Sequence, residues 1–107
     1  MRRKKDFDTL FRTGRRITFL LFRVVVRRNQ EGMLRAAFVT PRTVDKRATV
    51  RNRVRRRARE WVRRCPAVLA SPLDIAFIFN REAARATRPA FYDALERSME
   101  KIIGGVR

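Results

Sequence analysis

The side chains best able to do chemistry in this sequence are arginines, which crowd the segment from residue 51 to residue 64. Eight of these residues are arginine and one is glutamate. On a helix, residues three or four apart share a face, and like charges there repel by about 0.2–0.5 kcal/mol per pair. Arg53 and Arg57 have this spacing, as do Arg55 and Arg59. Phosphate groups between the guanidinium groups would reverse the sign of these interactions, because arginine donates paired hydrogen bonds to phosphate oxygens. The segment therefore predicts a helix that binds a polyanion.

Two other roles are open to so basic a helix. A helix that is merely solvated usually mixes both signs of charge, and this one does not. A membrane-surface helix needs a broad, bulky apolar face. The apolar stripe here is narrow and is needed for the core; it consists of Val50, Val54, Ala58, Trp61 and Cys65. Polyanion binding is the favoured interpretation, and its candidate contact residues, from the helix and the basic loop before it, are Arg42, Lys46, Arg47, Arg51, Asn52, Arg53, Arg55, Arg56, Arg57 and Arg59.

Asn52 is unusual inside a helix, because its amide competes for backbone hydrogen bonds. In the first turn that cost is small, and the side chain is expected either to contact the polyanion or to fix the preceding loop. The helix N-terminus, flanked by Arg51 and Arg53, is also a favourable site for an anion.

Side chains that catalyse hydrolysis or hold metals are missing from the sequence. There is no histidine, and the single cysteine, Cys65, has no base to activate it. Cys65 falls at the end of the apolar stripe and is interpreted as a small buried side chain. No pair of carboxylates stands out among the ten acids, and no Gly-rich phosphate loop is present. The sequence predicts neither protein-only catalysis nor a metal bound by a protein motif.

The overall charge narrows the partners further. Lysine and arginine number 28 against 10 acids, a formal charge of +18, and residues 1–64 hold 22 of the basic residues and five of the acids. Such an excess destabilises a compact protein by self-repulsion and indicates a polyanionic partner, either nucleic acid or an anionic membrane surface. No apolar segment approaches the ~20 residues that span a bilayer, and no signal peptide is recognisable. We therefore expect a soluble, cytoplasmic protein without a membrane partner.

These side chains need a scaffold, and 107 residues provide room for one domain. A flexible basic arm is expected over residues 1–5, followed by a helix that begins at Asp6, its N-cap, and stops at Gly14. The other expected elements are a strand over 17–28, a turn over 29–32, a strand over 34–40, a helix over 49–64 capped by Thr49 and ended by Pro66, a strand over 73–80 and a helix from residue 87. The order α-β-β-α-β-α predicts an α+β single domain, with helices packed on a central sheet.

Alternation within the strands predicts which side chains share a face. In the strand over 17–28, one side carries Leu20, Phe22, Val24 and Val26, and the other carries Phe19, Leu21, Arg23, Val25 and Arg27. In the strand over 73–80, Ile75, Phe77 and Phe79 alternate against Ala76 and Ile78. The last helix has an apolar face made of Phe91, Leu95, Met99 and Ile102.

Phe7 and Phe11 lie one turn apart on the first helix and have two open interpretations. As core residues they need no further explanation. Alternatively, at least one lines a cleft and stacks on single-stranded bases, while Arg23 and Arg27 follow the backbone. Three apolar positions are too few to settle which face of this helix is buried.

The segment from Lys46 to Glu60, with Arg51-Asn52-Arg53 at its centre, resembles the signature helix of the bacterial ribonuclease P protein family. The resemblance covers almost the whole chain in order. Its other parts are Asp6-Phe7, Phe11 and Gly14, which are similar to the family's first-helix motif, Leu34-Arg35 before the second strand, and Asp74-Ile75 opening the third.

The resemblance implies an activity as well as a fold. In this family the second helix connects parallel strands by a left-handed β-α-β crossover. The RNA subunit of ribonuclease P, with bound magnesium ions, removes the 5′ leader from precursor tRNA, and the protein subunit assists this endoribonuclease reaction. The catalytic centre is then expected in the RNA, and no small-molecule substrate is expected. The main alternative is a ribosomal or RNA-chaperone protein that binds structured RNA.

The family's functional residues carry over by position. The helix that contains Arg51-Asn52-Arg53, with the basic loop before it, is expected to face the catalytic RNA. The leader cleft is expected to be lined by Phe7, Phe11, Arg12, Arg23 and Val25. Two departures from the family pattern bear on these expectations. The loop over 40–46 is one residue longer than usual and lacks a glycine, and Val25 stands where an aromatic residue is common, so stacking from that strand is expected to be weaker.

Overall fold

A four-stranded mixed sheet forms the centre of the computed structural model, which describes residues 4–106. In chain order the elements are α1 (Lys4–Thr13), β1 (Arg15–Thr18), β2 (Phe22–Arg28), β3 (Arg35–Val39), α2 (Ala48–Arg63), α3 (Pro66–Leu69), β4 (Leu73–Phe79), α4 (Arg81–Arg85) and α5 (Arg88–Val106). The strand order is β1-β2-β4-β3, with β4 antiparallel to β2 and parallel to β3. The α+β fold is confirmed, and α2 makes the β-α-β crossover between the parallel neighbours β3 and β4.

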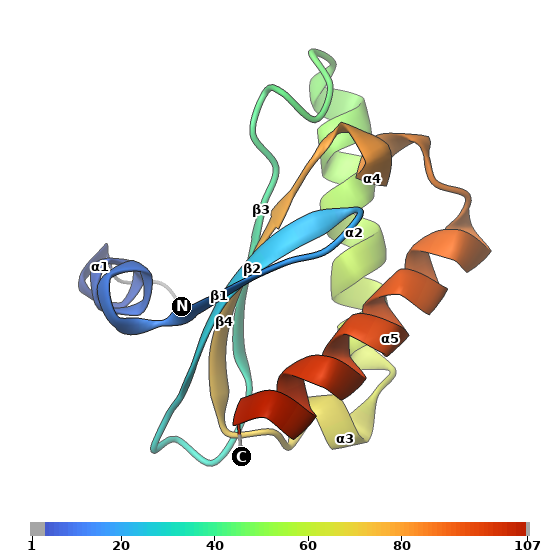
Figure 1. The fold of residues 1–107 in the computed structure, drawn as a ribbon. Helices are drawn as coiled ribbons and strands as arrows, with labels where there is room; N and C mark the ends of the chain where they lie inside the picture. The colour runs from blue at the N-terminus through green and yellow to red at the C-terminus, as the bar shows by residue number, and fades with distance from the viewer. Residues whose placement is uncertain (1–3, 107) are drawn as a thin grey trace.

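The two faces of the sheet are covered unequally. Among the described residues, one face is covered by α1, whereas α2 and α5 lie against the other (Figure 1). The main core lies on the α2 and α5 side. In it the rings of Phe22, Phe77 and Phe79 contact one another, and the ring of Phe91 stacks on that of Phe79. A smaller cluster under α1 contains Leu10, Val25, Ala37, Ala76 and Ile78. Because β4 is central and both its faces are covered, all seven of its residues are buried.

The alternation predicted for β4 and the apolar face predicted for α5 are confirmed. Ile75, Phe77 and Phe79 belong to the main core, and Ala76 and Ile78 belong to the cluster under α1. On α5, the main core contains Phe91, Leu95, Met99 and Ile102. These positions are predictable because a helix stripe and a strand face each follow a fixed period.

The strand predicted over 17–28 is instead a hairpin of two antiparallel strands, β1 and β2. Phe19 N donates to Phe22 O at 2.8 Å and closes a loop whose tip is Leu20 and Leu21. Leu20 is 80% exposed while Leu21 is buried in the main core, so the predicted alternation fails over 19–21. No glycine, proline or asparagine marks this turn. Hydrogen bonds from Asn80 hold it, since Asn80 Nδ2 donates to Leu20 O at 2.8 Å and Asn80 N donates to Leu21 O at 3.1 Å.

The first two long helices begin earlier than expected. α1 starts at Lys4, so Lys4 and Lys5 are helical and Asp6 lies in the first turn rather than at the N-cap. Residues 1–3 of the predicted arm lie outside the described residues. α2 starts at Ala48, and Arg47 rather than Thr49 is its N-cap.

Two short helices were not expected from the sequence. α2 ends at Arg63, and Pro66 begins α3 two residues after the Arg64 C-cap. Asn80, expected as the last residue of a strand, is the N-cap of α4, and its Oδ1 accepts a hydrogen bond from Ala83 N at 3.3 Å. Helices of four and five residues carry too few periodic positions to be recognised from a pattern.

Gly14 ends α1 where that helix meets the sheet. A Cβ at this position would lie 2.6 Å from Leu10 O and 2.7 Å from Val25 Cγ1. A larger residue would therefore push α1 away from β2, and the glycine permits the close approach on which the cluster under α1 depends.

Candidate nucleic-acid interface

A cleft of about 390 Å³ opens between α1 and the β1–β2 hairpin. Its lining residues are Phe11, Arg16, Ile17, Thr18, Arg23, Val24, Val25 and Ile78. Three of the residues expected in a leader cleft, Phe11, Arg23 and Val25, are therefore brought together. The cleft combines a flat ring with cationic side chains, which are the two components that bind single-stranded nucleic acid.

Phe11 is both a packing residue and a cleft residue. Its ring stacks on Phe7, with the ring centroids 6.2 Å apart and the planes 14° from parallel. Both rings are half-buried and pack against the cluster that contains Leu10. Only Phe11 of the two lines the cleft. The core and cleft interpretations thus both apply to Phe11, whereas the contacts of Phe7 are those of a packing residue.

The other cleft residues differ in how they are presented. Arg23 is exposed, whereas Val25 is only 2% exposed and forms part of the floor. Arg12 is exposed on α1 and is not among the residues that line the cleft. Arg16 was missed in the sequence, because its place in the cleft depends on a hairpin that carries no turn signal. Its Nη2 donates to Phe11 O at 2.7 Å.

The arginine-rich helix α2 turns its charges away from the sheet. Its predicted apolar residues Val50, Val54, Ala58 and Trp61 are buried, together with Val62. Cys65 is half-buried against the main core, and burial raises the pKa of its thiol. Of the predicted contact residues on this helix, Asn52, Arg53, Arg56 and Arg59 are exposed, and Arg51, Arg55 and Arg57 are half-buried.

Arg51 and Arg55 use some of their nitrogens to bind the protein itself. Arg51 Nη1 donates to Asp45 O and to Lys46 O, each at 2.9 Å, and so fixes the loop before α2. Arg55 Nη2 donates to Asn52 Oδ1 on the same helix. The loop-fixing role open to Asn52 is therefore filled by Arg51. Because a guanidinium group has five N–H donors, both arginines retain donors for phosphate.

Arg57 is tied to a distant part of the chain. Its Nη1 donates to Ala86 O at 3.1 Å, which links the middle of α2 to the segment between α4 and α5. Burial lowers the pKa of Arg57, and the positive charges of Arg53 and Arg88 lower it further. Arg57 is thus a predicted contact residue with a structural hydrogen bond of its own.

A wider groove, of about 1060 Å³, lies beside the N-terminal end of α2. Its cationic lining residues are Arg42, Lys46, Arg47, Arg53, Arg81 and Arg85, and its one acid is Asp45. Four of these cations were predicted as contact residues. Arg81 and Arg85 were not, because they enter the groove from α4, a helix too short to be predicted.

Asp45, the acid of this groove, is already paired. Its two carboxylate oxygens accept hydrogen bonds from the Arg47 side chain at 3.1 and 3.2 Å, and Oδ1 also accepts one from Arg47 N at 2.8 Å. The hydrogen bonds from Arg47 hold the pKa of Asp45 at about 2. The carboxylate therefore offsets one cation only, and the groove as a whole stays positive.

The cleft and the groove are connected around one end of the sheet. A third hollow shares Thr18, Arg23 and Ile78 with the cleft. The same hollow shares Thr43 and Arg81 with the groove. The surface predicted for single-stranded RNA and the surface predicted for structured RNA are therefore adjacent parts of one cationic track.

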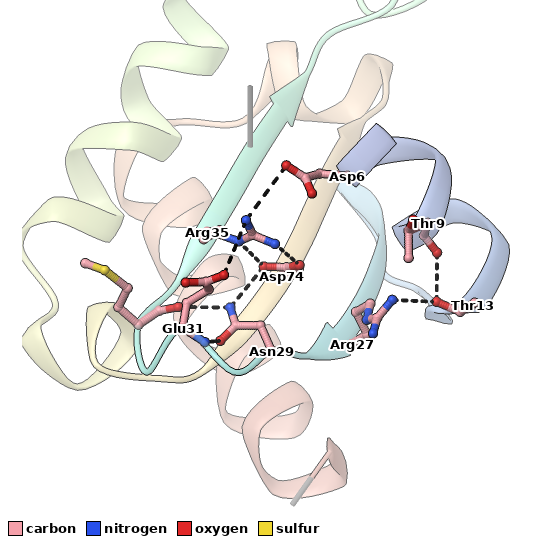
Figure 2. A network of polar contacts seen from close by, with 9 residues as sticks. Asp6, Thr9, Thr13, Arg27, Asn29, Glu31, Arg35 and Asp74 are labelled. Atoms are coloured by element: carbon pink, nitrogen blue, oxygen red, sulfur yellow. Dashed lines mark hydrogen bonds and ion pairs between the residues drawn. The ribbon is translucent and has the colours of Figure 1, made fainter. Parts of the chain in front are cut away.

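The other end of the α1-covered face carries a network of ion pairs (Figure 2). The network lies in a further hollow of about 550 Å³, which Lys5, Arg27 and Arg28 also line. Arg35 Nε and Nη2 donate to the Asp74 carboxylate, each at 2.7 Å, and Asn29 Nδ2 donates to Asp74 Oδ1 at 2.9 Å. Asp6 and Glu31 approach Arg35 Nη1 at 3.8 and 4.0 Å. Burial acts to raise the pKa of Asp74, but the hydrogen bonds from Arg35 and Asn29 prevail and lower it. The network keeps a buried carboxylate ionised and connects α1, β3 and β4.

Two further observations concern metals and membranes. Within residues 4–106, no group of three or more His, Cys, Asp or Glu side chains is arranged to hold a metal ion. In that same range, none of the helices combines the length and the apolar character needed to cross a bilayer.

Comparison with known proteins gives one family and several related structures. A family model for ribonuclease P matches residues 1–103. The RNase P protein from Thermotoga maritima superposes with a TM-score of 0.84 at 26% sequence identity, and the match covers 94% of each chain. The RNase P protein from Staphylococcus aureus superposes with a TM-score of 0.82 at 22% identity, covering 94% of this chain and 91% of that one, a likeness of fold. No curated protein matches the chain.

Proposed function

The chain belongs to the ribonuclease P protein family, and from this premise we propose how its surfaces divide the work of the holoenzyme. The protein is a subunit of ribonuclease P. It binds RNA and acts in tRNA processing. We assign the exposed face of α2 and the adjoining groove to the catalytic RNA. We assign the cleft beneath α1 to the 5′ leader of precursor tRNA.

Charge supports the first assignment. The groove carries six cations against one acid, and that acid is bound by Arg47. Arg53 and Arg56 continue the positive surface along the exposed side of α2. Folded RNA presents closely spaced phosphates, and much of the affinity of such an interface comes from neutralising them.

Shape supports the second assignment. The cleft, at about 390 Å³, is much smaller than the groove, and its lining includes one aromatic ring, that of Phe11, and two cations, Arg16 and Arg23. An unpaired strand exposes its base faces for stacking, which paired RNA does not. A short single-stranded leader fits this cleft better than a duplex does.

Catalysis is assigned to the RNA subunit with its magnesium ions. The chain contains no histidine, and the acids Asp45 and Asp74 are engaged with arginines. The protein's part in the reaction is then to bind and orient the two RNAs. Binding of the two RNAs by the protein brings the catalytic RNA and the precursor tRNA into the geometry of the reaction, without any chemical step on the protein.

The observation that carries this function is the continuous track from the cleft to the groove. A leader that leaves the cleft at Arg23 reaches Arg81 at the edge of the groove without crossing an acidic surface. The protein is thereby able to hold the catalytic RNA and the leader at adjacent sites.

The test is leader removal at low magnesium concentration. A bacterial ribonuclease P RNA is mixed with precursor tRNA, with and without this protein, and formation of the mature 5′ end is followed. We expect the protein to accelerate cleavage, and polyarginine of similar charge to fail to do so. A ribosomal or chaperone protein would give no acceleration.

The division of labour has its own control. The protein is incubated with precursor tRNA and magnesium in the absence of the RNA subunit, and no cleavage is expected. Cleavage by the protein alone would contradict the assignment of the catalytic centre to the RNA.

A further inference from the structure

Arg16 is a cleft residue that neither the sequence pattern nor the family resemblance identifies. We propose that Arg16 is a leader-binding residue whose planar guanidinium group contacts a leader nucleotide beside the ring of Phe11. This inference rests on the proposed function, because it assigns a new residue to the cleft that holds the leader.

The strand register places Arg16 over the floor of the cleft. Arg16 is the cross-strand partner of Val25 in the β1–β2 pair, and directly opposed residues of antiparallel strands project from the same face. Val25 is buried, whereas Arg16 is exposed. Arg16 therefore supplies a flat polar group next to the position where Val25 lacks an aromatic ring.

The guanidinium group is held in place before any RNA arrives. Arg16 Nη2 donates to Phe11 O at 2.7 Å, one of the last carbonyls of α1, where the helix dipole favours a cation. One hydrogen bond leaves most of the five N–H donors and the flat faces of the group available. A guanidinium plane stacks on nucleic-acid bases and attracts phosphate, and a group that is already oriented loses little entropy on binding.

Charge in the cleft depends strongly on this residue. Arg16 and Arg23 are the two ionisable side chains that line the cleft, and the lining includes no acid. Arg16 thus accounts for one of two positive charges that a leader meets there. Its neighbour Arg15 has the same charge but belongs to the opposite face of β1, where Nη1 donates to Gly105 O at 3.0 Å.

The test compares Arg16→Ala with two matched variants. Arg15→Ala removes the same charge and a similar hydrogen bond to a carbonyl, but on the other face of β1. Thr13→Ala removes a different tie between α1 and the sheet, the 3.0 Å hydrogen bond from Arg27 Nη1 to Thr13 Oγ1, and Thr13 does not line this cleft. Each variant is assembled with ribonuclease P RNA, and the Kd is measured for precursor tRNA with a leader and for mature tRNA.

We expect Arg16→Ala to weaken binding of the leader-bearing tRNA by about tenfold, as for loss of one stacked contact, and to leave mature tRNA unchanged. Arg15→Ala and Thr13→Ala should leave the ratio of the two Kd values at the parent level. The inference is overturned if Arg16→Ala leaves that ratio at the parent level, or if Thr13→Ala changes it as much as Arg16→Ala does.

The Arg16→Lys variant tests whether the planar guanidinium group contributes to the affinity for leader-bearing tRNA. Lysine keeps the positive charge without the flat guanidinium group, so we expect it to recover only part of the lost affinity. Full recovery would mean that charge alone suffices, and the proposed planar contact would be wrong. Thermal melts of each free variant establish that the protein is folded before RNA is added.

Failure of this inference is distinguishable from failure of the proposed function. If the parent holoenzyme binds leader-bearing and mature tRNA equally well, the leader cleft itself is wrong. If the parent discriminates between them and Arg16→Ala discriminates equally, the cleft stands and only the role of Arg16 is lost.

Discussion

Arg53 and Arg57 lie one turn apart on α2, yet their surroundings differ. Arg53 is exposed and lines the groove, whereas Arg57 is half-buried and donates to Ala86 O. We expect both alanine variants to weaken assembly with the catalytic RNA, by about 1–3 kcal/mol for each lost charged hydrogen bond. Only Arg57→Ala should also lower the melting temperature of the free protein. RNA titrations and thermal melts measure the two effects separately.

Arg97→Ala is the control for this pair. Arg97 is exposed on α5 and pairs with Asp93 at 3.1 Å, outside the groove. An exposed pair of this kind contributes little to stability, so both RNA affinity and melting temperature should match the parent. Equal losses of RNA affinity for Arg53→Ala and Arg97→Ala would indicate a general charge effect rather than an interface on α2.

Phe11 and Phe7 form a second informative pair. Both are half-buried and stack on each other, but only Phe11 lines the cleft. We expect each alanine variant to lower the free energy of unfolding, by less than the roughly 3–5 kcal/mol of a fully buried phenylalanine. Phe11→Ala should in addition weaken binding of leader-bearing tRNA by about 1–3 kcal/mol, and Phe7→Ala should not. Equal effects of the two variants on leader binding would remove Phe11 from the leader contact.

The types and spacing of the arginines led to a prediction of their role from the sequence, but the hydrogen bonds that they make within the protein could not be predicted. The density and spacing of arginines over 51–64 predicted polyanion binding without any structure. Which of these arginines are already bound depends on carbonyls in other segments, those of Asp45, Lys46 and Ala86. A sequence pattern contains residue types and intervals, whereas these contacts depend on where the loops fold back.

At the scale of elements, the pair of Arg35 on β3 and Asp74 on β4 predicts a pH dependence of stability. The pKa of Asp74 is lowered in the folded protein, so its contribution to stability is fully present above the unfolded value of about 3.9 and is lost as the pH falls through the lower, folded value. Asp74→Asn should cost on the order of 3 kcal/mol at pH 7, the low end for breaking a buried pair, because the Arg35 side chain is 31% exposed.

Urea unfolding of the parent and of Asp74→Asn, measured between about pH 7 and pH 3, checks this expectation, since the difference between them should shrink below about pH 4. Asp93→Asn is the matched control, because its partner Arg97 is exposed, and it should change stability little at any pH. A difference for Asp74→Asn that stays constant down to pH 3 would show that the carboxylate charge is not what stabilises the network.

Elements with a long apolar pattern were predicted well. The stripe of α2, the face of α5 and the alternation of β4 all follow fixed periods over many residues. The β1–β2 hairpin was missed because its tip, Leu20 and Leu21, consists of residues that favour strands, and the hydrogen bonds that hold it come from Asn80, far away in sequence. Arg16 was missed as a site residue because its position depends on this hairpin. Arg81 was missed because its position depends on α4, which was not predicted.

At the scale of the whole molecule, the charges are sorted by the fold. Three of the ten acids, Asp6, Glu31 and Asp74, gather around Arg35 at one end of the α1-covered face. The opposite end opens through Arg23 and Arg81 toward the groove beside α2. The first end is nearly balanced, because Lys5, Arg27, Arg28 and Arg35 line its hollow beside the three acids. The groove that is proposed to meet RNA is lined by six cations and one acid.

This distribution predicts a steep dependence of RNA binding on salt. Each phosphate that the protein neutralises releases condensed counterions, so the association constant falls with salt concentration. If six or more phosphates are contacted, affinity for the catalytic RNA should fall by roughly 10³-fold or more between about 50 and 200 mM salt. Removing Arg53 should make the slope of log K against log salt shallower by about one, because that residue is exposed on the groove. Arg97→Ala, which removes an equal charge elsewhere, should leave the slope unchanged. A nearly flat response of the parent would mean that the arginines of α2 and the groove do not bind phosphate.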